Sequence, residues 1–261
     1  MNYYSMADIS LTQLAFPLNV FACATFLQEG QVDYLHYGLF DEGHNSIQAA
    51  QGQSTEMILR RLPERGKRVL EIGIGLGATA TIMADHGLRV TGITPDPTQV
   101  DIARRRAGGT VQFEVVPFED YTAPAGGFDM ILLQESSQYL DPAILFCKAY
   151  QLLVPGGRML ILDQFALRQC DPAESLLHYG VDFIHQAETH GFELREHIDL
   201  SRRAMPTLDY ILKIIDAHKD AILNHLPIQA ADLAGLRDAV AANRRRYHES
   251  ILGYALYDLA R

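Results

Sequence analysis

The chain has 261 residues, of which 48% are hydrophobic, and a formal net charge of −10. This composition is typical of a folded globular chain and excludes a disordered one. The excess of acidic residues argues against a nucleic-acid partner, because phosphate binding needs a cationic face. Three cysteines far apart in the sequence favour neither a disulfide framework nor a zinc site, and the ten histidines show no metal-binding spacing.

The most apolar stretch is residues 11–27, which Gln13, Pro17 and Asn19 interrupt and which no basic residue precedes. It therefore predicts neither a signal peptide nor a membrane span. From this we expect a cytoplasmic protein without a membrane partner.

From residue 68 onward, short apolar runs alternate with helical patterns, as is typical of a parallel sheet with crossover helices. Five strands are expected, at residues 68–72, 88–93, 111–116, 128–133 and 158–162. Two crossover helices begin at Asp-Pro pairs, in which Asp96 and Asp141 are the N-caps and proline occupies the first turn. These features predict an α/β fold with a doubly wound, Rossmann-like sheet.

Beyond the fifth strand the pattern predicts a helix at 172–190 and strands at 192–200 and 251–259, which makes a seven-stranded, mostly parallel sheet. Residues 201–250 predict two or three helices, because such a long insertion is rarely a bare loop. We therefore expect an N-terminal helical lid at 1–44, a core at 45–200 and 251–261, and a helical cap at 201–250.

The most informative segment is the glycine-rich turn after the first strand, which contains Gly73, Gly75 and Gly77. Glycine lets the backbone turn tightly and approach a ligand closely. The spacing also fits a dinucleotide-binding pattern. Against that interpretation, the carboxylate of Glu71 would repel a pyrophosphate, and the second strand ends at Thr94 where a dinucleotide site needs an acid.

Residues 71–77 resemble the first motif, E/D-x-G-x-G-x-G, of the class I S-adenosylmethionine-dependent methyltransferases. Residues 90–100, 128–139 and 152–158 are similar to later motifs of that family, in the same order. Residues 34–40 and 134–138 resemble segments of its small-molecule group, which acts on natural products, sugars, sterols and tocopherols. The resemblance implies a biosynthetic transferase that uses S-adenosylmethionine to methylate a small molecule held under the helical cap.

The resemblance also implies where the cofactor binds. The glycine turn would hold the methionine moiety, the residues after the second strand the ribose, and those after the third strand the adenine, while aromatic rings favour the sulfonium. Thr94 also fits a plain strand end, and Glu119 and Asp120 also fit an exposed loop. The predicted cofactor-binding residues are Tyr34, Tyr37, Glu71, Gly73, Gly75, Gly77, Thr94, Gln99, Phe118, Glu119, Asp120, Gln134 and Ser136.

The predicted catalytic residues are His36, Glu135, Gln138 and Tyr139. Methyl transfer depends mainly on alignment, but O- or C-methylation usually adds a general base, often histidine. Where the small-molecule group has a histidine after the fourth strand, this chain has Gln138, which cannot accept a proton. The base therefore comes from elsewhere, or the acceptor is an amine or thiolate that needs none. The alternative bases are His36, Glu135, His178, His185 and Tyr210.

Two other functions stay open. The missing histidine also fits a non-methylating S-adenosylmethionine-binding homologue, such as a cyclase or a partner subunit. An NAD(P)-dependent oxidoreductase fits the glycine spacing but lacks the acid after the second strand. The expected partner is a small molecule, and a homodimer is left open.

Overall fold

The computed structural model describes residues 10–41, 46–171 and 175–261. Its contacts divide the chain into two compact units. Residues 57–201 and 250–261 form the sheet unit, and residues 1–56 and 202–249 form the helical unit.

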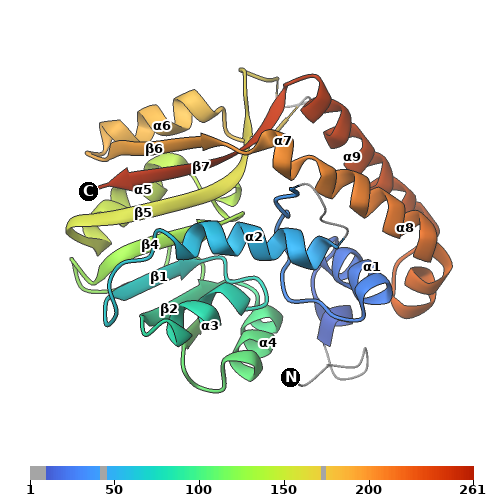
Figure 1. The fold of residues 1–261 in the computed structure, drawn as a ribbon, viewed down its shortest axis with the longest axis horizontal. Helices are drawn as coiled ribbons and strands as arrows, with labels where there is room; N and C mark the ends of the chain where they lie inside the picture. The colour runs from blue at the N-terminus through green and yellow to red at the C-terminus, as the bar shows by residue number, and fades with distance from the viewer. Residues whose placement is uncertain (1–9, 42–45, 172–174) are drawn as a thin grey trace. The chain divides into compact units, whose positions relative to one another are not determined.

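The sheet unit contains a seven-stranded sheet with the strand order β3-β2-β1-β4-β5-β7-β6 (Figure 1). Six strands run parallel, and β7 is antiparallel to both of its neighbours. The strands are β1 Arg68–Ile72, β2 Arg89–Thr94, β3 Gln112–Val115, β4 Phe128–Gln134, β5 Leu153–Ala166, β6 Glu193–Asp199 and β7 Leu252–Ala260. The predicted α/β, mostly parallel, seven-stranded sheet is confirmed.

The crossover helices of this unit are α3 Ala78–Asp85, α4 Pro97–Ala107, α5 Pro142–Leu152 and α6 Gly180–Thr189. Asp96 accepts hydrogen bonds from the Thr98 and Gln99 amides, and Asp141 accepts one from the Ile144 amide. Both aspartates are therefore N-caps, as the Asp-Pro pairs predict. In Figure 1, α3 and α4 lie on one side of the sheet and α5 and α6 on the other.

The prediction of a helix over 172–190 is wrong for residues 175–179. Residues 172–174 lie outside the described residues, and α6 begins only at Gly180. The His178 carbonyl instead accepts a hydrogen bond from the Ala166 amide at 2.9 Å. Residues 178 and 179 therefore pair with the end of β5. The His178 carbonyl is then used by this pairing and cannot accept a hydrogen bond within a helix.

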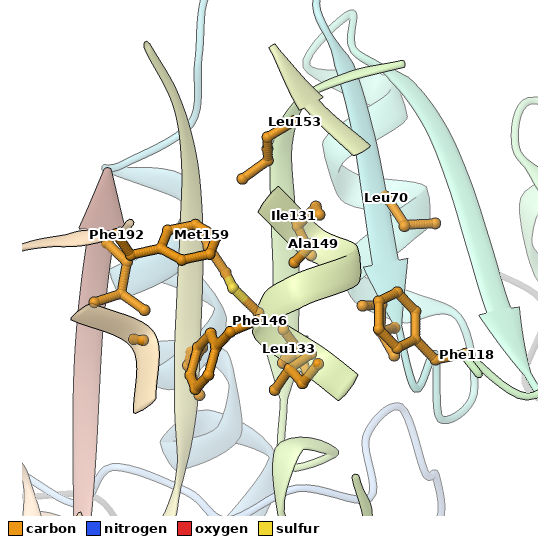
Figure 2. Close-up of a cluster of buried hydrophobic side chains, with 14 of the residues drawn as sticks. Leu70, Phe118, Ile131, Leu133, Phe146, Ala149, Leu153, Met159 and Phe192 are labelled. Carbon is orange, nitrogen blue, oxygen red and sulfur yellow. The ribbon is translucent and has the colours of Figure 1, made fainter. Parts of the chain in front are cut away.

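One face of the sheet carries the main hydrophobic core. Leu70, Ile131 and Met159 of the strands pack against Phe146 and Ala149 of α5 (Figure 2). Side chains alternate between the two faces of a strand, so Glu71 points to the opposite face from Leu70.

The helical unit is built from η1 Ser10–Gln13, α1 Leu18–Glu29, α2 Ile47–Leu59, α7 Ser201–Ala204, α8 Pro206–His225 and α9 Ala230–His248, with α2 and α7 crossing its boundary. Val20 of α1, Ile215 and Ile222 of α8 and Leu233 of α9 share a buried core. Residues 31–41 form no helix or strand. The roles of these segments as lid and cap stay predictions. None of the described helices has the length and apolar character needed to span a bilayer.

Candidate cofactor site

The glycine-rich turn joins β1 to α3 in a left-handed backbone conformation, with φ of +80° at Gly73, +51° at Gly75 and +76° at Gly77. A Cβ at Gly73 would lie 2.4 Å from Cβ of Ser136, and one at Gly77 would lie 2.5 Å from Cβ of Ala103. A Cβ at Gly75 would meet nothing within 4 Å. Close packing therefore requires glycine at 73 and 77, whereas the backbone conformation alone favours it at 75.

Glu71 lies near the end of β1 and is only 2% exposed. Burial raises the pKa of its carboxyl group to about 8, because the charged form loses its hydration. Its Oε2 atom is buried and makes no hydrogen bond within the part of the chain that the structure describes. A buried carboxyl group with an unused acceptor beside a glycine turn suits a cationic group of a ligand.

The end of β2 brings together two of the predicted ribose contacts. The Thr94 hydroxyl donates to Oε1 of Gln99 at 3.2 Å, and both side chains are buried. Asp96, between them in sequence, uses its carboxylate to cap α4. The structure thus places Thr94 and Gln99 in contact.

The end of β4 is connected to the glycine turn. Thr79, at the start of α3, donates from its hydroxyl to Oε1 of Gln134 at 2.9 Å. The Ser136 hydroxyl donates to the Ile72 carbonyl, at the end of β1. In open α/β sheets, ligands bind at the carboxyl ends of the strands, where these side chains lie.

Glu135 has φ of +58°, which is uncommon for a residue with a side chain. Its carboxylate accepts a hydrogen bond of 2.6 Å from the Tyr254 hydroxyl on β7. Strained backbone of this kind is concentrated at functional sites. The predicted catalytic Glu135 is therefore held in one orientation by a residue of β7, two strands away from β4 in the sheet.

A short turn, η2 Ser137–Tyr139, presents Gln138 and Tyr139. Asp163 of β5 is completely buried, and its Oδ2 accepts from the Ser137 amide at 2.8 Å, the Ser137 hydroxyl at 2.6 Å and the Gln138 amide at 3.2 Å. Asp163 is not among the residues predicted from the sequence. The one feature that could have pointed to it is its position as a single acid directly after the apolar run of residues 159–162.

His178 holds the other end of this turn. Its Nε2 lies 3.2 Å from the Ser137 carbonyl and 3.0 Å from the Leu140 carbonyl. Carbonyls only accept, so Nε2 carries the hydrogen and donates it. His178 therefore has no free lone pair at Nε2 with which to act as a base.

Of the three predicted adenine contacts after β3, one is buried and two are exposed. Phe118 is buried in the core cluster (Figure 2), and the Lys148 ammonium lies 5.4 Å from the centre of its ring. Glu119 and Asp120 are exposed. The Phe118 ring thus has a packing role, and contact of these residues with an adenine ring stays a prediction.

The aromatic segment of the helical unit brings its predicted site residues together. The rings of Tyr34 and His36 lie 4.8 Å apart, and Tyr37 stacks with Tyr247 at 6.4 Å. Burial lowers the pKa of His36 to about 4, because the protonated ring loses its hydration.

The methyltransferase domain family matches residues 70–161, which include the glycine turn and the ends of β2 and β4. This part of the chain therefore resembles a methyltransferase domain. A ubiquinone biosynthesis O-methyltransferase of Thiobacillus denitrificans is 36% identical over 102 residues, which cover 37% of this chain and 44% of the relative. The chain spans about half the length of the curated relatives it matches.

Two solved structures share the fold of this chain. The cyclopropane synthase MmaA2 of Mycobacterium tuberculosis superposes with a TM-score of 0.81 at 17% identity, covering 99% of both chains. The [4+2]-cyclase SpnF superposes with a TM-score of 0.77 at 23% identity, covering 91% of this chain and 93% of that one. The predicted resemblance to the class I methyltransferases and the Rossmann-like fold are confirmed.

Proposed function

We propose that this chain is an S-adenosylmethionine-dependent methyltransferase acting on a small molecule. The observation that carries the proposal is the glycine turn beside the buried carboxyl group of Glu71, whose Oε2 has no hydrogen-bond partner among the described residues. S-adenosylmethionine supplies a methyl group activated by a positively charged sulfur, and it also carries an ammonium. A turn that needs glycine and a buried acid fit such a cation better than they fit a pyrophosphate.

The residues at the strand ends would divide the binding of the cofactor. The backbone of the glycine turn and Glu71 would hold the methionine moiety, and Thr94 with Gln99 the ribose hydroxyls. Gln134 and Ser136 fix the end of β4 against the glycine turn. Because methyl transfer needs in-line alignment above all, this fixed geometry would supply much of the rate.

Glu135 and His36 are the proposed bases, and Gln138 and Tyr139 the proposed contacts to the acceptor. The hydrogen bond from Tyr254 orients the Glu135 carboxylate. The ring of His36 stays neutral above about pH 4, so it offers a lone pair at neutral pH, but its lowered pKa makes it a weak base. The homodimer and the cytoplasmic location stay predictions.

The direct test is incubation with S-adenosylmethionine labelled in its methyl group and a panel of phenols, alcohols, amines and thiols. We expect label in one class of acceptor together with S-adenosylhomocysteine. Label that never leaves the cofactor, although calorimetry shows binding, would overturn methyl transfer. That result would support the second candidate function, a non-methylating cyclase, which Gln138 and the shared fold with a [4+2]-cyclase favour. Tight NAD binding would instead support an oxidoreductase.

The raised pKa of Glu71 predicts pH-dependent binding. At pH 6 the carboxyl group is mostly protonated, and a cationic ligand binds the ionised form, so binding releases a proton. We expect the affinity for S-adenosylhomocysteine, which keeps the ammonium, to rise about tenfold or more between pH 6 and pH 8. Calorimetry in buffers of different ionisation enthalpy measures this proton release.

The control is Glu71→Gln, which keeps the shape but cannot ionise. Its affinity should be low and nearly constant over this pH range. In the ligand-free chain the raised pKa means that Glu71 destabilises the fold as pH rises from about 4.5 through 8. Glu71→Gln should therefore be more stable than the original chain at pH 8. An unchanged pH profile would contradict the role of Glu71.

A further inference from the structure

The helical unit contains buried polar atoms without hydrogen-bond partners. Among them are Nε2 of His36, Oε1 of Gln51 and Oγ1 of Thr55, none of which bonds to any residue that the structure describes. Buried polar atoms are almost always paired in native proteins, so each unpaired one needs a physical reason. Only His36 has a role in the proposed reaction.

These three side chains come from neighbouring stretches of backbone. Gln51 and Thr55 are one turn apart on the same side of α2. Gln51 donates from Nε2 to the His36 carbonyl at 2.5 Å. The chain around Gly38 lies directly against α2, at a distance that only glycine permits, because a Cβ on Gly38 would lie 2.5 Å from Cβ of Ala50.

The hydrogen positions make two of the atoms acceptors. Nδ1 of His36 lies 2.9 Å from the Tyr37 carbonyl, which only accepts, so Nδ1 carries the hydrogen. In the neutral ring, Nε2 is then a lone-pair acceptor. Gln51 uses its amide nitrogen on the His36 carbonyl, which leaves Oε1 as the second acceptor.

Thr55 departs from the usual behaviour of a helical threonine. Such a hydroxyl commonly donates to the carbonyl four residues earlier, and Thr81 does so to the Gly77 carbonyl at 2.7 Å. The Thr55 hydroxyl, although only 2% of the residue is exposed, makes no such bond in the described structure. It is therefore available as both donor and acceptor.

We propose that His36, Gln51 and Thr55 form a binding site for a hydroxyl or ammonium group of a ligand. Two acceptors and a hydroxyl match a group that donates hydrogen bonds, and a buried site makes each such bond strong. The inference rests on the proposed function, because both the cofactor and a hydroxyl- or amine-bearing acceptor carry such a group. The experiment separates these two sources.

The first measurement needs no ligand and uses Thr55→Val, which replaces the hydroxyl by a methyl group of similar size. Removing an unpaired buried hydroxyl should raise Tm of the full chain by about 2–4 °C. The matched control is Thr207→Val in the same unit. Thr207 is equally buried, but its hydroxyl accepts from the Gly38 amide at 3.1 Å and donates to the Gly38 carbonyl at 3.2 Å, so Tm should fall.

The second measurement identifies the source of the ligand group. If the cofactor supplies it, Thr55→Val should weaken S-adenosylhomocysteine binding about fivefold or more, as expected for one lost hydrogen bond. If the acceptor supplies it, that affinity stays constant and KM for the acceptor found by label transfer rises about fivefold. Thr55→Ser, which keeps the hydroxyl, should restore the lost affinity in either case.

A fall in Tm of Thr55→Val like that of Thr207→Val would overturn the inference, since the hydroxyl would then be satisfied by the protein or an internal water. A rise in Tm with unchanged S-adenosylhomocysteine affinity and unchanged KM would also overturn it. Failure of the original chain to bind S-adenosylhomocysteine overturns the proposed function instead.

Discussion

Gly73→Ala should abolish cofactor binding and strongly destabilise the sheet unit. An alanine at φ of +80° is strained, and its Cβ would lie 2.4 Å from Cβ of Ser136, far inside van der Waals contact. The two effects together should lower the free energy of unfolding by about 3 kcal/mol or more. Urea unfolding measures the stability, and titration with S-adenosylhomocysteine should show at least a hundredfold loss of affinity.

Gly75→Ala is the matched control, because it introduces backbone strain but no steric overlap with a neighbouring side chain. Its φ is +51° and a Cβ there would have no neighbour within 4 Å, so we expect a loss of about 1 kcal/mol. The double variant Gly73→Ala with Ser136→Gly removes the overlapping side chain and should regain part of the stability. Equal losses for Gly73→Ala and Gly75→Ala would mean that strain, and not overlap, fixes the turn.

The elements that the sequence predicted well are those with local causes. Asp96 and Asp141 cap their helices because the cap bonds reach only two or three residues along the chain. The glycine turn was recognisable because left-handed backbone favours one residue type. Thr94 and Gln99 come together because they flank a single turn.

The features that the sequence did not reveal depend on distant partners. Asp163 on β5 bonds to Ser137, which follows the adjacent strand β4, and the spacing of 26 residues carries no local signal. The sequence after β5 predicts a helix over 172–190, but the hydrogen bond from the Ala166 amide to the His178 carbonyl keeps residues 175–179 out of it. The unpaired hydroxyl of Thr55 is likewise invisible in sequence, because threonine in a helix is ordinarily bonded to its own backbone.

Asp163→Ala should be about as damaging as Gly73→Ala, although Asp163 lies outside the predicted cofactor contacts. It removes the acceptor for the Ser137 amide and hydroxyl and for the Gln138 amide, and also for the Gln164 amide at 2.7 Å. Leaving several buried donors unpaired should cost about 3–5 kcal/mol of unfolding free energy. We also expect kcat for the acceptor to fall about a hundredfold, because the turn carrying Gln138 and Tyr139 loses its anchor.

Cofactor affinity separates this role from a general loss of structure. The glycine turn and Glu71 do not use Asp163, so S-adenosylhomocysteine affinity measured below the unfolding temperature should change less than threefold, within about 0.6 kcal/mol. Ser137→Ala removes only one of the bonds and should keep most of the activity. A comparable loss of affinity and kcat in Asp163→Ala would show that the turn supports the whole site and not the acceptor alone.

The fall of kcat at acidic pH tests whether Asp163 anchors the turn that carries Gln138 and Tyr139, without unfolding the chain. Burial raises the pKa of Asp163 to about 6, although four hydrogen bonds oppose the shift. Protonation places a donor where the turn needs an acceptor, so kcat should fall as pH drops through about 6. Stability should not fall with it: because the folded pKa exceeds the unfolded one, protonation of Asp163 favours the folded state between pH 6 and about 4. Activity that falls while stability holds would assign the effect to the turn, whereas a parallel loss of both would contradict it.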